Sequence, residues 1–339
     1  MASPLPIANQ AAREPGGLVQ VEKLGLTVLY EPKRNAPKAD VVFVHGLQGH
    51  PQRTWRYKGT VAKTTAVHEN SLSKIMGLTS NPNRRLKDMT TTGVVYWPLE
   101  LLPGTHEDIR ILTYGYDSHV SNWFTGPANK MTIATHGRSL LNDLARERQD
   151  SRGRPMIFVA HSLGGLVVKE ALIEARKQKY HNHLNEIYSS CEAIIFFGTP
   201  HRGSGAAKWA VLLGNIASAA QFDTNIGIAR DLDPSGGSDK LEELRRDFND
   251  ILEEGKIKIH TFQEAFGIAG LKIVSSKIVP DESSSFDSRK FEIVDTINAN
   301  HMDMCRFGSI DDVGYKKFVC ALAKPPRMFS VKLTLHQKK

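Results

Sequence analysis

The sequence predicts an α/β fold, in which a mostly parallel sheet carries helices on both of its faces. Short apolar runs that read as buried strands alternate along the chain with longer segments of helical spacing. Strand–helix–strand alternation is typical of a parallel sheet, because the chain must cross a face of the sheet to begin the next parallel strand. Such apolar runs occur at 41–45, 109–114, 156–160 and 193–197.

The turn around Ser162 narrows this fold class to the α/β-hydrolases. The apolar run 156–160 is followed within three residues by a helical pattern over 163–177, and Ser162 lies between them. Ala160 and Gly164 stand two residues before and two after this serine. Small residues at those positions allow the strained strand-to-helix turn, the nucleophile elbow, which exposes a serine Oγ above the sheet edge. The alternative is an ordinary strand–helix junction with an incidental serine.

A glycine-containing loop after the run 41–45 predicts an oxyanion hole. Acyl transfer places negative charge on a carbonyl oxygen, and two backbone N–H groups must already point at it. In this fold one donor belongs to the residue after the nucleophile, here Leu163, and the other to a loop after an earlier strand, here Leu47. Gly46 allows a close backbone approach. We expect His45 to have a structural role.

A serine nucleophile requires a general base, and His301 is the candidate. Histidine has the side chain whose pKa suits proton transfer at neutral pH. The chain has 13 histidines, but His301 stands out because it follows the last expected strand. The chain order serine, acid, histidine is the one found in this fold.

The acid of the triad should follow the next-to-last strand. Glu264 ends the strand-like run 257–264, and Asp281 follows the next such run as the alternative. Asp303 is too near His301 in sequence, and Asp223 is a remote candidate. Each of these carboxylates could equally be a solvated surface group.

The remaining sequence organises around this core. Residues 1–17 are expected to be a disordered tail, 18–325 the hydrolase domain and 326–339 a basic C-terminal tail. Entry strands are expected within 19–30, a surface insertion, loop or partly helical, at 56–95, and a helix at 131–148. Residues 200–256 contain two helical patterns, at 206–220 and 241–252. They form either a small helical lid over an acyl pocket, with Trp209 and Leu213 as substrate-binding residues, or crossover helices.

Composition and charge restrict the class of protein. The 339 residues are 40% hydrophobic and 24% charged, as in globular domains, and the three cysteines form no paired framework. With no apolar run of membrane-spanning length, these features favour a cytoplasmic or other intracellular protein. The net charge of +8 favours peripheral contact with anionic membranes. The basic residues are scattered, so no nucleic-acid partner is expected, and no cofactor or metal motif is present.

Seven motifs together resemble one group of serine hydrolases. They are similar to the lipase-like α/β-hydrolases of the serine-active-site, lipid-remodelling family, whose domain also stands at the N-terminus of fungal NACHT, ankyrin and tetratricopeptide proteins. The resemblance covers roughly residues 20–322 and implies an ester substrate. It also favours Glu264 as the acid, because the corresponding strand of the relatives ends in a glutamate after an aromatic residue. The motifs lie at 45–50, 54–55, 97–103, 110–117, 160–165, 198–203 and 301–306.

Two functions follow from these observations. The first is a serine esterase or lipase that cleaves or transfers carboxylic esters, with lipid-like substrates expected. The alternative is a catalytically weak sensing or interaction domain of a NACHT-type signalling protein. The sequence leaves open the acyl chain, the alcohol, hydrolysis against transfer, and the oligomeric state.

Overall fold

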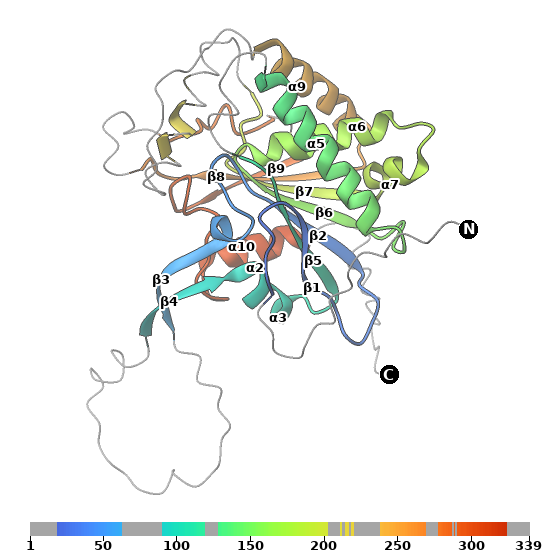
Figure 1. The fold of residues 1–339 in the computed structure, drawn as a ribbon. Coiled ribbons are helices and arrows are strands. Elements are labelled where there is room, and N and C mark those ends of the chain that lie inside the picture. Colours follow the sequence, from blue (N-terminus) through green and yellow to red (C-terminus); the bar gives the residue numbers. More distant parts are fainter. Residues whose placement is uncertain are drawn as a thin grey trace, which may run out of the picture.

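A computed structural model of the 339-residue chain shows a single large sheet between two layers of helices (Figure 1). The structure describes residues 19–62, 90–118, 128–202, 211, 214–216, 218–219, 238–268, 277–286, 288 and 290–323. The tails predicted at 1–17 and 326–339 lie outside these residues, as do Trp209, Leu213 and Asp223.

The sheet has seven strands in the order β1-β5-β2-β6-β7-β8-β9. β1 runs antiparallel to β5, and every other neighbouring pair is parallel. The predicted fold class, a mostly parallel α/β-hydrolase sheet, is therefore confirmed. The strands are β1 (Gly25–Tyr30), β2 (Ala39–Val44), β5 (Ile109–Gly115), β6 (Met156–His161), β7 (Cys191–Phe197), β8 (Lys258–Glu264) and β9 (Glu292–Ile297).

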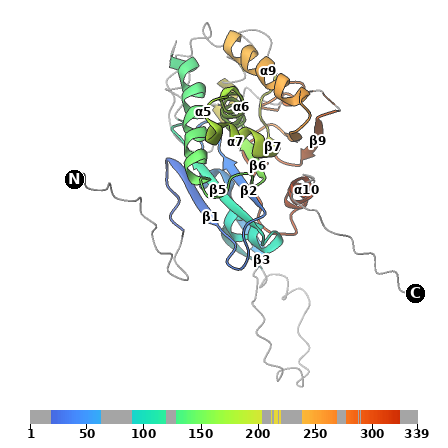
Figure 2. The same cartoon turned by 90° about the vertical axis from the view of Figure 1, so that its right-hand side faces the viewer.

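Helices cover both faces of this sheet, and Figure 2 shows the layers from the side. Successive side chains of a strand point to opposite faces, so a strand covered on both faces must be apolar throughout. In β2, Val42 and Val44 join one buried cluster, whereas Val41 and Phe43 join the other. One layer contains α5 (Ala128–Glu147), α6 (Gly164–Lys177), α7 (Asn182–Ser190) and α9 (Ser238–Glu253); the other contains α2 (Trp97–Glu100), α3 (Leu102–Thr105) and α10 (Val313–Leu322).

Aromatic packing in the second layer supports the loop that carries His301. Trp55, at the end of the 3₁₀ turn η1 (Arg53–Trp55), and Trp97 are both fully buried against Phe43. The Trp97 indole Nε1–H donates to the Cys305 carbonyl at 2.9 Å. Because Cys305 is four residues after His301, this hydrogen bond fixes the far end of the histidine loop.

An ionic cluster lies at the end of the sheet where the parallel strands begin. Asp40 in β2 is completely buried and accepts hydrogen bonds from Arg110 at 3.1 Å, from Arg154 at 2.9 Å and from Arg148. A buried carboxylate needs such partners, because an unpaired charge in the interior is costly. This cluster joins β2, β5 and the end of α5, and it lies away from the ends of β6 and β8 that precede Ser162 and contain Glu264.

The segment 56–95 differs from the expected loop or partly helical insertion. Its two ends form an antiparallel hairpin of β3 (Arg56–Ala62) and β4 (Thr90–Tyr96), with Gly59 opposite Gly93. Thr, Val and Tyr are frequent in these ends, and such residues favour strands. Residues 63–89 lie outside the described part.

The segment 200–256 is described only in part. Ile216 and Ala219, from the helix expected at 206–220, are buried in the same core cluster as Val42 and Val44 of β2. Val211, from the same expected helix, is 64% exposed. α9 buries Leu244 and Phe248 in the same cluster. α9 therefore packs as a crossover helix on the sheet layer.

A buried lysine should make stability depend on pH. Lys169 of α6 is 1% exposed, and its Nζ lies 4.6 Å from the ring centroid of Phe286. Burial lowers the pKa of this amine to about 7 from 10.5. Between those values the unfolded chain holds a proton that the folded chain has lost, so stability rises with pH.

We therefore expect the free energy of unfolding to rise between about pH 7 and about pH 9 by more in the wild type than in Lys169→Met. Urea unfolding of both proteins at each pH measures the difference. Lys256→Met, at an exposed position, is the matched control. An equal rise in wild type and Lys169→Met would show that the amine does not lose its proton on folding.

Candidate active site

Ser162 occupies a strained turn between β6 and α6. Its φ is +53°, in the left-handed region that side chains other than glycine rarely adopt. Three hydrogen bonds hold the turn: Ser162 N–H donates to Phe197 O at 2.8 Å, and the Ser162 carbonyl accepts from Gly165 N–H at 3.1 Å and from Thr199 Oγ1 at 2.9 Å. Backbone strain that surrounding contacts maintain is a feature of catalytic sites and of the nucleophile elbow.

Glycine is required at two positions around this turn. A Cβ at Gly164 would lie 2.2 Å from the His45 carbonyl oxygen, so α6 could not approach the end of β2 with any larger residue. A Cβ at Gly46 would lie 2.7 Å from Ser162 Cβ and 2.9 Å from the His161 carbonyl. The loop after β2 therefore lies directly against the serine.

The predicted oxyanion donors belong to these two closely packed segments. Leu163 N–H follows the serine, and Leu47 N–H follows Gly46 in the adjacent loop. Within the described part of the chain, neither N–H donates to another backbone carbonyl. The next residue, Gln48, has a φ of +53°, which turns the loop sharply after Leu47. Neither amide is thus committed to a backbone acceptor among the described residues, as an oxyanion donor requires before substrate binds.

Substituting Gly46 with alanine should impair catalysis, because the added Cβ must push the oxyanion loop away from Ser162. We expect kcat for ester hydrolysis to fall by about 10²-fold, the cost of misplacing one oxyanion donor. Leu47→Met should have a much smaller effect, since the donor at that position is the backbone. Steady-state kinetics of both variants on a p-nitrophenyl ester make the comparison. A larger loss in Leu47→Met would contradict the assignment.

His301 reaches the serine from the loop that follows β9. Its ring is completely buried, and Nε2 lies 3.0 Å from Ser162 Oγ. In the tautomer suited to catalysis, the hydroxyl donates to Nε2. Gly198 provides the space for this ring: its φ is +55°, and a Cβ there would lie 2.9 Å from His301 Nδ1.

Glu264 is the carboxylate next to His301. It ends β8, is 1% exposed, and its Oε1 lies 3.8 Å from His301 Nδ1. Oε1 also accepts from Val279 N–H at 2.6 Å, whereas His301 Nδ1 has no hydrogen-bond partner among the described residues. The 3.8 Å distance is within range of an ion pair and longer than a hydrogen bond; catalytic hydrogen bonds are often long without substrate.

The other candidate acids lie elsewhere. Asp281 is at the surface and binds Lys277 Nζ at 2.7 Å. Asp303 is also exposed and pairs with Arg306 at 3.1 Å. The structure thus brings Ser162, His301 and Glu264 together and keeps these two aspartates apart from the histidine ring.

Three further residues position the site, and sequence reasoning assigned none of these roles. Gly198 and Thr199, described above, belong to the motif at 198–203. His161 Nε2–H donates to the His301 carbonyl at 2.9 Å and so joins the elbow to the histidine loop. Burial, followed by the neighbouring His301, holds the pKa of His161 well below its ordinary value, so it stays neutral. The position of His161 directly before Ser162 is the sequence feature that could have indicated this role.

His45 has the contacts of a structural residue. Its ring stacks on Tyr116 with centroids 4.4 Å apart, and its carbonyl accepts from the Tyr116 hydroxyl at 2.8 Å. Burial lowers the pKa of its imidazole to about 3. A neutral, fixed ring at this point supports the start of the oxyanion loop.

No metal site or membrane span is found in the described part of the chain. No group of three or more His, Cys, Asp or Glu residues there could hold a metal ion. None of the helices described is long and apolar enough to cross a bilayer. The three cysteines are free, and Cys191 and Cys305 are buried.

Comparison with known proteins finds a serine esterase family model and a group of relatives to which the chain is similar. Residues 128–228, which include Ser162, match the family model "Putative serine esterase (DUF676)". The chain is 28% identical over 302 residues to Protein SERAC1 of Mus musculus, covering 87% of this chain and 41% of that protein. It is 27% identical over 300 residues to Protein SERAC1 of Danio rerio, and this match covers 86% of this chain and 40% of that protein. The chain thus spans about two fifths of the length of these relatives.

Solved structures of lipases match the chain at low identity and with TM-scores below 0.5. Mature lipase BlEst2 of Bacillus licheniformis has a TM-score of 0.47 and 18% identity, covering 88% of this chain and 97% of that chain. The monoacylglycerol lipase of Paleococcus ferrophilus has a TM-score of 0.42 and 14% identity, covering 89% and 97%. The chain is therefore similar to SERAC1 and, over residues 128–228, to a serine esterase family.

Proposed function

We propose that this protein is a serine hydrolase that cleaves or transfers carboxylic esters through Ser162, His301 and Glu264. The observation that carries this proposal is the 3.0 Å contact between Ser162 Oγ and His301 Nε2 on a turn whose serine has a φ of +53°. A serine within hydrogen-bond reach of a histidine on a nucleophile elbow is the arrangement that activates the hydroxyl.

The proposed reaction has two halves. His301 Nε2 takes the Ser162 hydroxyl proton as Oγ attacks the ester carbonyl, and the resulting oxyanion accepts hydrogen bonds from Leu47 and Leu163 N–H. The imidazolium then gives its proton to the leaving alcohol, which leaves an acyl-serine. Water, or an acceptor alcohol in acyl transfer, attacks this intermediate with His301 again acting as base. Glu264 orients the ring and stabilises its charged form.

Lipid-like esters are the proposed substrate class. This part of the proposal depends on the sequence pattern around Trp209 and Leu213, on the similarity to SERAC1 and on the net charge of +8. An apolar acyl chain gains about 0.8 kcal/mol for each CH₂ that it buries. We expect the longer chain to be preferred wherever an apolar pocket accommodates it.

Activity on p-nitrophenyl esters from acetate to palmitate tests the substrate class. We expect kcat/KM to rise with chain length before solubility becomes limiting, and Trp209→Ala to flatten that rise. Trp97→Ala is unsuitable as a control because Trp97 is in the core, so Tyr180→Ala, at a 94% exposed position, is the matched aromatic control. A preference for acetate that Trp209→Ala leaves unchanged would exclude lipid-like substrates.

The alternative is a sensing domain of a fungal NACHT-type protein that retains the hydrolase fold with little activity. Such a domain would bind an ester without turnover. Absence of turnover on every ester of the series, in a folded protein, would favour this alternative over the enzyme.

A further inference from the structure

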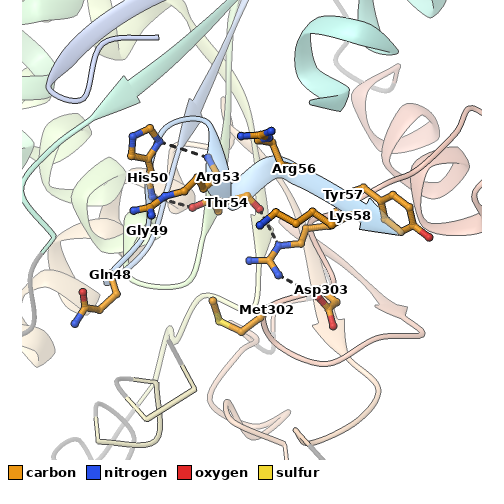
Figure 3. A pocket seen from close by; sticks show the side chains of 11 residues that line it. Gln48, Gly49, His50, Arg53, Thr54, Arg56, Tyr57, Lys58, Met302 and Asp303 are labelled. Atoms are coloured by element: carbon orange, nitrogen blue, oxygen red, sulfur yellow. Dashed lines mark hydrogen bonds and ion pairs between the residues drawn. The ribbon is translucent and has the colours of Figure 1, made fainter. Parts of the chain in front are cut away.

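A cavity of about 500 Å³ lies between the start of β3 and the loop after His301 (Figure 3). Three segments line it: the loop after β2, the stretch from η1 into β3, and the loop after His301. Figure 3 shows Arg53, Arg56 and Lys58 on one side of this pocket, with Met302 and Asp303 on the other. We call this space the β3 pocket.

The β3 pocket is lined in part by sequence neighbours of the proposed catalytic residues. Gln48 and Gly49 line the pocket, and they directly follow Gly46 and Leu47 of the oxyanion loop. Met302 on the other wall directly follows His301. The pocket is therefore lined by residues one and two positions beyond the proposed oxyanion donor Leu47 and one position beyond His301, which makes it the candidate site for a part of the substrate next to the ester.

The lining of the β3 pocket is strongly basic. Arg53, Arg56, Lys58 and Arg306 contribute four positive charges, and Asp303 is the sole carboxylate among the lining residues. Asp303 pairs with Arg306 at 3.1 Å. Among the described residues, no ion pair neutralises Arg53, Arg56 or Lys58, which leaves three positive charges around one space.

The positive charges of the pocket act on the neighbouring His50. His50 also lines the pocket, and its pKa is lowered by burial first and then by Arg53, Lys23 and Arg56. Its Nδ1 accepts from the Gln52 N–H at 3.1 Å, which is the neutral arrangement. Two of the pocket arginines, Arg53 and Arg56, thus lie close enough to His50 to act on its charge.

Three cations without an ion pair in the described part of the chain exceed what one carboxylate would neutralise. A phosphate monoester carries between about −1.5 and −2 charges at neutral pH and offers several acceptor oxygens. Arginine binds phosphate through two parallel N–H donors, and lysine binds it as a point charge. A cavity of about 500 Å³ also has room for a phosphate together with a small alcohol.

We propose that the β3 pocket binds a phosphate group carried by the ester substrate, and that Arg53, Arg56 and Lys58 are its ligands. This inference rests on the proposed esterase function and adds the residues that select the substrate. The phosphate can belong to a soluble phosphorylated ester or to a phospholipid headgroup, since both present the same anion.

A pair of esters differing only in the phosphate tests the proposal. The butyrate monoester of glycerol 3-phosphate is compared with glycerol monobutyrate. We expect the wild type to have a higher kcat/KM for the phosphorylated ester, and this preference to fall roughly tenfold or more when Arg53, Arg56 and Lys58 are all changed to Gln. Lys58→Gln alone, at an exposed position, is a milder variant should the triple variant fail to fold.

The matched control changes net charge equally at distant exposed positions. Arg138→Gln, Arg152→Gln and Lys179→Gln together also remove three positive charges, and we expect this variant to keep the wild-type preference. A wild-type enzyme with no preference, or a preference that the pocket variants retain, would overturn the proposal and leave the esterase function standing.

A binding experiment separates this proposal from the esterase function. Calorimetry with glycerol 3-phosphate, using glycerol as the neutral reference, needs no turnover. Binding that the wild type shows and the pocket variant loses would support the phosphate site even if neither ester were cleaved. In that case the esterase function would fail.

Vesicles distinguish the two sources of phosphate. Sedimentation with phosphatidylcholine vesicles, with and without phosphatidylserine, measures headgroup binding. Vesicle binding that depends on the anionic lipid and on the pocket residues would indicate that the phosphate belongs to a phospholipid. Binding of glycerol 3-phosphate without binding of vesicles would indicate a soluble phosphorylated ester. If the protein bound neither vesicles nor glycerol 3-phosphate and did not prefer the phosphorylated ester, the proposal would be overturned.

Discussion

Replacing Ser162 with alanine should lower kcat for ester hydrolysis by about 10⁴- to 10⁶-fold. The change removes the Oγ that lies 3.0 Å from His301 Nε2 and leaves the backbone donors in place. Folding should be nearly unaffected, because the strain at a φ of +53° is the same for serine and alanine. Steady-state kinetics and thermal unfolding of the purified variant measure both effects.

His301→Ala should cause a loss of similar size, since nucleophile and base act as one unit and their effects are not additive. Ser189→Ala, an exposed serine on α7 with hydrogen bonds only to local carbonyls, is the matched control. Near-normal turnover in Ser162→Ala would mean that another group attacks the ester.

Glu264→Gln should lower kcat by about 10²- to 10⁴-fold, the range expected when a triad histidine loses its orienting charge. The amide oxygen of the new side chain can still accept from Val279 N–H, so the end of β8 should keep its structure. KM should change little, because the carboxylate acts through His301. Kinetics at several pH values separate a loss of kcat from a shift in the pH profile.

Asp281→Asn is the control for this prediction. Its carboxylate binds Lys277 at the surface, and removing an exposed ion pair costs little. We expect at most about a twofold change in kcat. The reverse order, with Asp281→Asn the more damaging variant, would move the acid of the triad to the segment after Val279.

The strained turn at Ser162 was predictable because its determinants are local. Small residues at Ala160 and Gly164, one strand before them and one helix after them, leave few alternatives to a strained turn. The central strands were predictable in the same way, since β2, β5, β6 and β7 are apolar on both faces. A continuous apolar run is the signal of a strand covered on both sides.

The elements at the edges of the sheet and on the surface were harder to predict from their sequence patterns. β9 lies at the end of the sheet, and its sequence, Glu-Ile-Val-Asp-Thr-Ile, has buried ends and a partly exposed middle. Ile293 and Val294 are 49% and 44% exposed. The short polar helix α7 was missed, and the ends of the 56–95 segment were expected to be loop or helix. Each of these elements depends on contacts with distant residues more than on its own pattern.

The choice of acid and the basic pocket both depend on the folded chain. The pattern of residues alone did not separate Glu264 from Asp281. The family resemblance favoured Glu264, and the packing of β8 beside the histidine loop brings its carboxylate to within 3.8 Å of His301. Arg306 joins residues 53–58 only when the histidine loop packs on η1. In sequence these cations looked scattered.

Reaction with a fluorophosphonate probe tests the central claim most directly, because the probe needs an activated serine and no knowledge of the substrate. The protein is treated with the probe, digested, and the modified peptide identified by mass spectrometry. We predict one modified residue, Ser162, with labelling lost in Ser162→Ala and strongly slowed in His301→Ala. A folded wild-type protein that remains unlabelled, or is labelled at another residue, would contradict the account.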